Sequence, residues 1–362
     1  MTQDKTSLPD LINRLVRPEI RDINAYHVQD ASGLLKLDAM ENPHVWSNEL
    51  QSEWLERLAS AEINRYPDPH SQQVVAKLGE TMQIPAEAGV VLGNGSDELI
   101  QILSFVLAGH NRKIMSPSPS FVMYDMIAKF VGSEFIDVPL TTDFQLDIDV
   151  MLAEIRSQQP ALIFLAYPNN PTGAAFKRHD IQRIIDLAEG VVVIDEAYHA
   201  FAGDSYLNDV LNYQNVIVMR TLSKLGLAGL RFGFMAGQAD LMTELEKARL
   251  PYNINVLTQL SVEFALENID FFDAKAEDIV EQRALLTQAL HAHVKVTEVY
   301  PSDANFILFK TAVDATQLHA DLKARGVLIK NMHKENSPLV NCLRVTVSTA
   351  EENEAFLHAL SH

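Results

Sequence analysis

The sequence predicts an α/β protein with a mainly parallel central sheet, helices on both faces of that sheet, and a smaller α+β domain after it. From about residue 71 to residue 219, helix-like and strand-like patterns alternate, which is typical of doubly wound sheets. Several strand patterns, such as 161–166 and 191–194, are continuous apolar runs, as expected for strands buried on both faces. The pattern changes after about residue 292, and 362 residues exceed what one core usually supports.

The expected elements follow one another in this order along the chain. Residues 1–30 form an N-terminal arm with a helix over 8–16. Strands are expected at 33–38, 89–92, 113–115, 134–138, 161–166, 191–194 and 216–219, and helices at 47–60, 71–82, 97–107, 121–131, 148–158 and 179–187. A helical region at 240–292, interrupted only by Pro251, precedes strands at 304–310, 327–330 and 342–347, with helices at 315–325 and from residue 350. We therefore expect a large domain over 31–250 and a small domain over 251–362.

The charge of the chain restricts its partners. With 29 basic and 48 acidic residues, the formal net charge is −19, which argues against nucleic acid or an anionic membrane as a partner. No run approaches the roughly 18 apolar residues of a membrane span, and residues 1–10 are polar, so we expect no secretory signal and a cytoplasmic location. One cysteine and scattered histidines predict no metal site.

Four unusual segments each follow a predicted strand. They are 93–98 (GNGSDE), 167–173 (YPNNPTG), 195–198 (DEAY) and 223–224 (SK). Ligands of doubly wound sheets bind beyond the carboxyl ends of the strands, where these segments would meet.

The segment 93–98 lies between a strand and a helix. Its glycines permit a tight turn, and the free N–H groups at Ser96 and Asp97 suit a phosphate group. An ordinary capped turn is the alternative interpretation. A nicotinamide-binding fingerprint is disfavoured because Glu98 stands where its third glycine would be.

Lys224 follows an apolar strand and is flanked by Ser223 and small residues. Small neighbours leave space around the amine, and an environment of low dielectric favours its neutral, nucleophilic form. Arg231, seven residues later, suits a phosphate because its guanidinium makes paired hydrogen bonds. A lysine beside a phosphate clamp is what a pyridoxal phosphate site requires, whereas a solvated loop is the alternative.

Four further residues are candidates for ligand contacts. Asn170 precedes a proline and offers its amide, and Tyr198 lies three residues after Asp195. Asp195 ends a buried strand, where an unpaired acid is costly, so it either caps a helix or pairs with a ring nitrogen. Phe121 is a core residue if considered alone and a stacking residue if it lies at the ligand.

The order of these motifs resembles that of the fold-type I, pyridoxal phosphate-dependent aminotransferases of class II, and most closely the histidinol-phosphate aminotransferases. The segments that carry the resemblance are 37–43 (LDAMENP), 65–68 (RYPD), 167–173, 195–198, 220–231 (RTLSKLGLAGLR) and 343–347 (LRVTV). They span nearly the whole chain.

The resemblance implies a role for each candidate residue. Lys224 would bind the cofactor covalently and move a proton, Asp195 would pair with its ring nitrogen, and Asn170 and Tyr198 would bind its phenolic oxygen. Ser96, Asp97, Ser223 and Arg231 would hold its phosphate, with Tyr66 reaching in from a neighbouring subunit, and Phe121 would stack on its ring. Tyr66 in that role implies a homodimer with shared active sites.

The resemblance also implies the substrates, L-histidinol phosphate and 2-oxoglutarate, in histidine biosynthesis. Arg344, Lys330, Asn42, and Tyr26 from the other subunit would bind the substrate. Three positions depart from the usual family pattern: Met40 replaces an asparagine, Lys330 an arginine and Phe121 a tyrosine. An aromatic amino-acid aminotransferase and a threonine-phosphate decarboxylase-like enzyme therefore remain alternatives. A non-catalytic sensor is disfavoured because the arm before Gly33 is too short for a DNA-binding domain.

Overall fold

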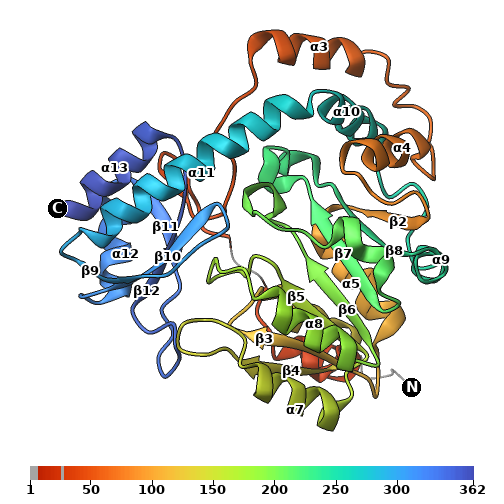
Figure 1. Cartoon of the computed structure of the whole chain (residues 1–362), viewed down its shortest axis with the longest axis horizontal. Helices are drawn as coiled ribbons and strands as arrows, with labels where there is room; N and C mark the ends of the chain where they lie inside the picture. Colours follow the sequence, from red (N-terminus) through yellow and green to blue (C-terminus); the bar gives the residue numbers. More distant parts are fainter. Residues whose placement is uncertain (1–6, 26–27) are drawn as a thin grey trace.

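The computed structural model describes residues 7–25 and 28–362 and contains two sheets (Figure 1). The large sheet has the strand order β2-β8-β7-β6-β5-β3-β4. Its strands are β2 (Ala88–Gly93), β3 (Lys113–Ser118), β4 (Glu134–Pro139), β5 (Leu162–Ala166), β6 (Val191–Asp195), β7 (Val216–Thr221) and β8 (Gly233–Gln238). All neighbouring pairs are parallel except those that β8 makes with β2 and β7. The predicted α/β fold with a mainly parallel sheet is confirmed.

Alternate residues of the central strands enter two different hydrophobic clusters. In β5, Ile163 and Leu165 belong to one cluster, whereas Leu162 and Phe164 belong to the other. All five residues of β5 are buried. Because a strand directs successive side chains to opposite faces, both faces of the sheet are covered, and this explains the continuous apolar runs in the sequence.

Helices cover both faces of the large sheet and lie over its edge strands (Figure 1). They are α4 (Gln72–Thr81), α5 (Gly95–Leu107), α6 (Met123–Val131), α7 (Ile148–Gln158), α8 (Arg178–Leu187) and α9 (Ala239–Glu246). The bounds of α7 agree with the predicted 148–158, since Asp147 caps the first turn and Gln159 adopts a left-handed conformation at the end.

The small sheet has the order β1-β11-β12-β10-β9. Its strands are β1 (Leu35–Leu37), β9 (Val296–Val299), β10 (Phe306–Thr311), β11 (Val327–Asn331) and β12 (Cys342–Thr346), with α12 (Ala315–Ala324) and α13 (Ala350–Ser361) beside them. β1 pairs with β11, so a strand within the predicted large domain lies in the second sheet. The boundaries at residues 31, 250 and 251 themselves stay a prediction.

Three differences separate the predicted elements from the observed ones. The region 240–292 forms α9, α10 (Val256–Glu267) and α11 (Ile269–His291) in place of a helical stretch with one interruption. β8 was not predicted because it contains two glycines and an alanine, which are depleted in strands. β9 is a four-residue strand with two exposed positions, and its pattern is correspondingly weak.

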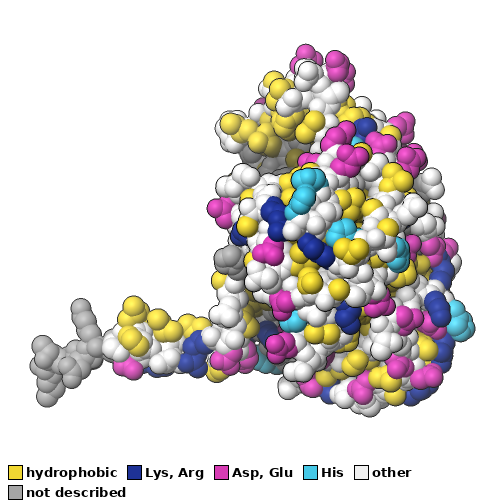
Figure 2. All heavy atoms as spheres, turned by 90° about the vertical axis from the view of Figure 1, so that its left-hand side faces the viewer, with side chains coloured by type: hydrophobic (Ala, Val, Ile, Leu, Met, Phe, Trp, Pro, Cys, Tyr) yellow, Lys and Arg dark blue, Asp and Glu magenta, His cyan; other side chains and the backbone are white. Residues whose placement is uncertain are grey.

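The N-terminal arm stands away from the rest of the molecule (Figure 2). Its first helix, α1 (Leu8–Leu15), has no buried residue, and the short α2 (Pro18–Arg21) follows it. Arg17 donates a hydrogen bond to the carbonyl oxygen of Phe130 at the end of α6. Among the described residues, no helix is long and apolar enough to cross a membrane.

Candidate active site

A cavity of about 220 Å³ lies beyond the carboxyl ends of β5, β6 and β7. It is lined by Ala39, Met40, Glu41, Ser96, Asp97, Phe121, Tyr124, Ala166, Asn170, Asp195, Ala197, Tyr198, Thr221, Ser223, Lys224, Ala228 and Arg231. The four segments that follow predicted strands therefore meet at one place, as parallel strands require.

Lys224 enters this cavity from a short 3-10 turn (Ser223–Leu225) directly after β7. Its Nζ atom donates a hydrogen bond to the carbonyl oxygen of Ala39 at 3.1 Å. Burial, together with the positive charge of Arg344, lowers the pKa of the amine to about 8. At pH 7 about a tenth of the amine is therefore neutral and nucleophilic, far more than at the usual pKa of a lysine.

Asp195 ends β6 with its carboxylate buried at the cavity. The hydroxyl of Tyr124 donates to Oδ2 at 2.6 Å, and the backbone N–H of Ala197 donates to Oδ1 at 3.1 Å. Burial raises the pKa of the carboxyl to about 6, although both hydrogen bonds oppose this shift. A buried carboxylate at a cavity is well suited to a cationic ring nitrogen, because an unpaired buried charge is costly.

The first turn of α5 forms one wall of the cavity together with Arg231. Gly95 has φ +76°, and a Cβ atom there would lie 3.0 Å from Nη2 of Arg231. The guanidinium also lies 3.6 Å from the carboxylate of Asp97. Free N–H groups of a helix start beside a guanidinium form a cradle for a phosphate, and the glycine keeps that space open.

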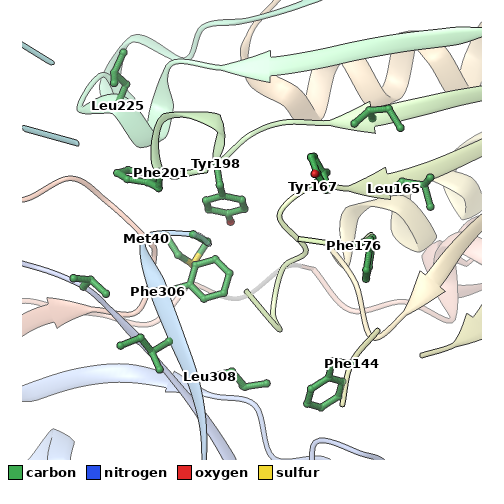
Figure 3. Packing of buried hydrophobic residues seen from close by; sticks show 14 of the residues in the cluster. Met40, Phe144, Leu165, Tyr167, Phe176, Tyr198, Phe201, Leu225, Phe306 and Leu308 are labelled. Atoms are coloured by element: carbon green, nitrogen blue, oxygen red, sulfur yellow. The ribbon is translucent and has the colours of Figure 1, made fainter. Parts of the chain in front are cut away.

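Asn170 and Tyr198 also line the cavity and are hydrogen-bonded to each other. Nδ2 of Asn170 lies 3.1 Å from the hydroxyl of Tyr198 and donates to it, while Oδ1 of Asn170 accepts a hydrogen bond from Arg344. Arg344, on β12, also donates to the carbonyl oxygen of Asp38 at 2.9 Å. Figure 3 shows the Tyr198 ring beside Met40 and Phe306, so residues of both sheets meet here.

A buried ion pair on the other side of the strands supports this site. Glu196 follows Asp195, and its Oε2 atom accepts hydrogen bonds from Nε and Nη2 of Arg220 at 2.9 and 2.8 Å. Ser205 Oγ donates to the same oxygen and accepts from Arg220. Because Arg220 lies near the end of β7 and Glu196 directly follows β6, the pair links the carboxyl end of β6, where Asp195 lies, to the end of β7, which Lys224 follows.

Among the described residues, four of the predicted ones do not line the cavity, namely Tyr66, Asn42, Lys330 and Arg344. Tyr66 is 81% exposed and stacks on Tyr252, with ring centroids 4.5 Å apart. Asn42 donates to the carbonyl oxygen of Leu225 at 3.3 Å. Lys330 lies on β11 directly opposite Arg344, whose guanidinium donates a hydrogen bond to Asn170 at the cavity. Tyr26 lies outside the described residues.

Tyr124 lines the site although it was not a predicted site residue, and Met40, noted from the sequence only as a departure from the family pattern, lines it too. Tyr124 lies on a helix among apolar residues, a pattern that indicates a core residue, and no sequence signal distinguishes it from one. Met40 lines the cavity with φ +53°, a left-handed conformation that asparagine adopts more readily. The sequence signal for Met40 was that it stands where the family usually has an asparagine.

The residues at the cavity match the chemistry of pyridoxal phosphate. An amine with a lowered pKa, a buried carboxylate and a phosphate cradle lie around one space. Phe121 also lines this space, at an edge-to-face angle of 88° to the Tyr124 ring. Among the described residues, no group of three or more His, Cys, Asp or Glu side chains could hold a metal ion.

Comparison with known proteins shows which family this chain is similar to. The family model of aminotransferases of class I and II matches residues 31–360. Histidinol-phosphate aminotransferase 2 of Nitrosococcus oceani is 49% identical over 352 residues, which cover 97% of this chain and 98% of the relative. The histidinol-phosphate aminotransferase of Chromobacterium violaceum is 47% identical over 349 residues, which cover 96% of this chain and 98% of the relative.

Solved structures share the fold. The histidinol-phosphate aminotransferase of Clostridium acetobutylicum superposes with a TM-score of 0.83 at 22% identity, covering 91% of this chain and 98% of that one. The enzyme of Sinorhizobium meliloti, solved in complex with pyridoxal-5'-phosphate, gives a TM-score of 0.83 at 19% identity, covering 95% and 96%.

Proposed function

Because this chain belongs to the family of class I and II aminotransferases, we propose that it converts L-histidinol phosphate and 2-oxoglutarate into imidazole-acetol phosphate and L-glutamate, with pyridoxal phosphate as cofactor. The observation that carries the proposal is the meeting of Lys224, Asp195 and the Asn170–Tyr198 pair around one cavity. The relatives, which match this chain over nearly their full length with nearly half of the residues identical, support the choice of substrate. The cytoplasmic location predicted from the sequence stays part of this proposal.

The bound cofactor would supply a conjugated ring that withdraws electrons from the substrate α-carbon. Lys224 would hold the cofactor covalently and, once released, take the proton from the α-carbon with its Nζ atom. Its lowered pKa suits this role because a base works best near the operating pH. Asp195 would keep the ring nitrogen protonated.

The remaining residues of the cavity would orient the cofactor. Asn170 and Tyr198 would bind its phenolic oxygen, since their polar groups already lie 3.1 Å apart at the cavity. Phe121 would stack on the ring. Ser96, Asp97, Ser223 and Arg231 would hold the phosphate through the helix start and the guanidinium.

Lys330 and Arg344 are our candidates for the substrate anion. They are paired across β11 and β12, so their side chains lie on the same face of the small sheet. Like charges opposite each other on a sheet are destabilising, and a dianionic phosphate would offset this repulsion. In this proposal Arg344 serves both the phosphate of histidinol phosphate and a carboxylate of glutamate, with Asn42 and Tyr26 as further contacts.

Removing the Lys330 charge should weaken the phosphorylated substrate selectively. We expect Lys330→Met to lower kcat/KM for histidinol phosphate by about tenfold or more, because a hydrogen bond to a charged group contributes about 1.5–3 kcal/mol. With glutamate as the amino donor, kcat/KM should change by less than about threefold, because the bidentate Arg344 fork remains. Steady-state kinetics with both donors measures the difference.

A substrate panel tests the function itself. The wild-type protein should turn over histidinol phosphate in preference to phenylalanine and to threonine phosphate. Turnover of phenylalanine without histidinol phosphate would replace the proposal with an aromatic aminotransferase. Release of carbon dioxide from threonine phosphate would replace it with a decarboxylase.

A homodimer with shared sites is the second part of the proposal. Several large apolar side chains are exposed near α3 (Asn48–Leu58) and α10, namely Val45, Leu55, Ile63, Tyr66, Leu250, Tyr252 and Leu257. Hydrophobic side chains also gather at the top of the molecule in Figure 2, where Figure 1 places α3. Exposed apolar patches of this kind mark protein interfaces. A second copy would cover them and bring its own Tyr66 to the site.

Mixing two inactive or weakened variants tests this sharing. We expect Tyr66→Ala and Lys224→Ala, unfolded and refolded together, to recover about a quarter of the wild-type activity, since each mixed dimer would contain one intact site. Activity assays before and after mixing, with sedimentation to show the dimer, give the result. Activity no higher than that of Tyr66→Ala alone would place Tyr66 outside its partner's site.

A further inference from the structure

We propose that Tyr124 is a positioning residue that orients the Asp195 carboxylate toward the ring nitrogen of pyridoxal phosphate. This inference rests on the proposed cofactor but is independent of the substrate. The observation behind it is a direct hydrogen bond of 2.6 Å between the Tyr124 hydroxyl and Oδ2 of Asp195.

Two donors restrict the rotation of the carboxylate. Tyr124 binds Oδ2, and the backbone N–H of Ala197 binds Oδ1 at 3.1 Å. One donor per oxygen fixes the plane of the group, whereas a single donor would leave it free to turn. Because the Ala197 bond is to the backbone two residues further on, Tyr124 is the contact that a side-chain change can remove.

Tyr124 is itself held rigidly. Its side chain is fully buried, and its ring lies parallel to Phe164 with centroids 4.5 Å apart and an interplanar angle of 3°. Phe121 meets the same ring edge-on, with centroids 5.6 Å apart. Tyr124 lies on α6, whereas Phe164 and Asp195 lie on β5 and β6. The hydroxyl is therefore placed by packing of three elements before any ligand binds.

The charges around Asp195 show why this contact matters. Burial raises the pKa of the Asp195 carboxyl, and the hydrogen bond from Tyr124 is the largest opposing effect. The negative charges of Asp97, on α5, and Glu196 raise this pKa further, and Tyr198 and Lys224 line the same cavity. Burial and Asp195 raise the pKa of Tyr124 well above its usual value, so its hydroxyl stays a donor.

The loss of the Tyr124 hydroxyl has a definite pH dependence. Without this bond the pKa of Asp195 rises, so the carboxyl stays neutral to a higher pH. Near pH 7 a larger fraction of this carboxyl would therefore be protonated in the variant than in the wild type. At pH 9 this difference in protonation would be smaller, and the loss of orientation would account for more of the effect. The affinity for pyridoxal phosphate should therefore fall more at pH 7 than at pH 9.

The experiment compares Tyr124→Phe with Tyr206→Phe as a matched control. Both tyrosines are fully buried, but Tyr206 belongs to one hydrophobic cluster and Tyr124 to the other. The Tyr206 hydroxyl lies 3.4 Å from the carbonyl oxygen of Arg178. Each holoenzyme is purified and stripped, and pyridoxal phosphate binding is followed by absorbance at pH 7 and pH 9. We expect Kd to rise at least about tenfold at pH 7 for Tyr124→Phe, less at pH 9, and little for the control.

A double variant separates positioning from simple support of the fold. If Tyr124 acts through Asp195, the change Tyr124→Phe should have little further effect on Kd when Asp195→Asn is already present. Equal and additive losses in both backgrounds, or equal Kd values for Tyr124→Phe and Tyr206→Phe, would overturn the inference. A wild type that binds no pyridoxal phosphate would overturn the proposed cofactor and this inference with it.

Discussion

Replacing Lys224 with alanine is expected to lower kcat for transamination by about 10⁴-fold or more, because one side chain would supply both the covalent attachment and the base. The amine lies at the cavity with its pKa lowered to about 8, and no other lysine lines that cavity among the described residues. Single-turnover measurements with excess enzyme distinguish loss of the chemical step from loss of cofactor.

Two controls make the Lys224 result specific. Lys247→Ala removes a lysine that pairs with Glu244 on the exposed surface, and its kcat should match the wild type. Added small primary amines should restore part of the activity of Lys224→Ala, since they can take up the proton in the vacated space. A Lys224→Ala enzyme with a tenth of the normal kcat would contradict the proposed role.

Replacing Arg220 with methionine is expected to lower the free energy of unfolding by about 3–5 kcal/mol, the usual cost of leaving a buried charge without its partner. The side chains of Glu196 and Arg220 are 0% and 8% exposed, respectively. The substitution leaves the Glu196 carboxylate with Ser205 and the Tyr206 backbone as donors but without a counter-charge. Urea unfolding followed by circular dichroism measures the loss.

The chain offers a matched ion pair on the surface. Arg183 lies 3.3 Å from Asp149, whose side chain is 88% exposed, and Arg183→Met should cost less than about 1 kcal/mol. In the double variant Arg220→Met with Glu196→Gln, much of the lost stability should return because no buried charge is left unpaired. Equal losses in the free energy of unfolding for Arg183→Met and Arg220→Met would show that the buried pair stabilises the fold no more than the exposed pair does.

The main features of the fold and the site were predictable because their causes are local. The apolar runs 161–166 and 191–194 indicate strands covered on both faces, whatever lies beside them. Lys224, Asp195 and Asn170 follow such strands, and the carboxyl ends of parallel strands must meet at one edge. Chain order and this rule together bring them to one cavity.

The remaining features depend on contacts between residues far apart in the sequence. Tyr124 and Asp195 are 71 residues apart, and only the tertiary structure brings the phenol on α6 to the carboxylate at the end of β6. Strand β1 pairs with β11, nearly 300 positions later, and so joins the small sheet. Periodicity specifies which face of an element is buried but not which partner covers it. That choice is made by the register and order of the strands, which the chain adopts only when it packs.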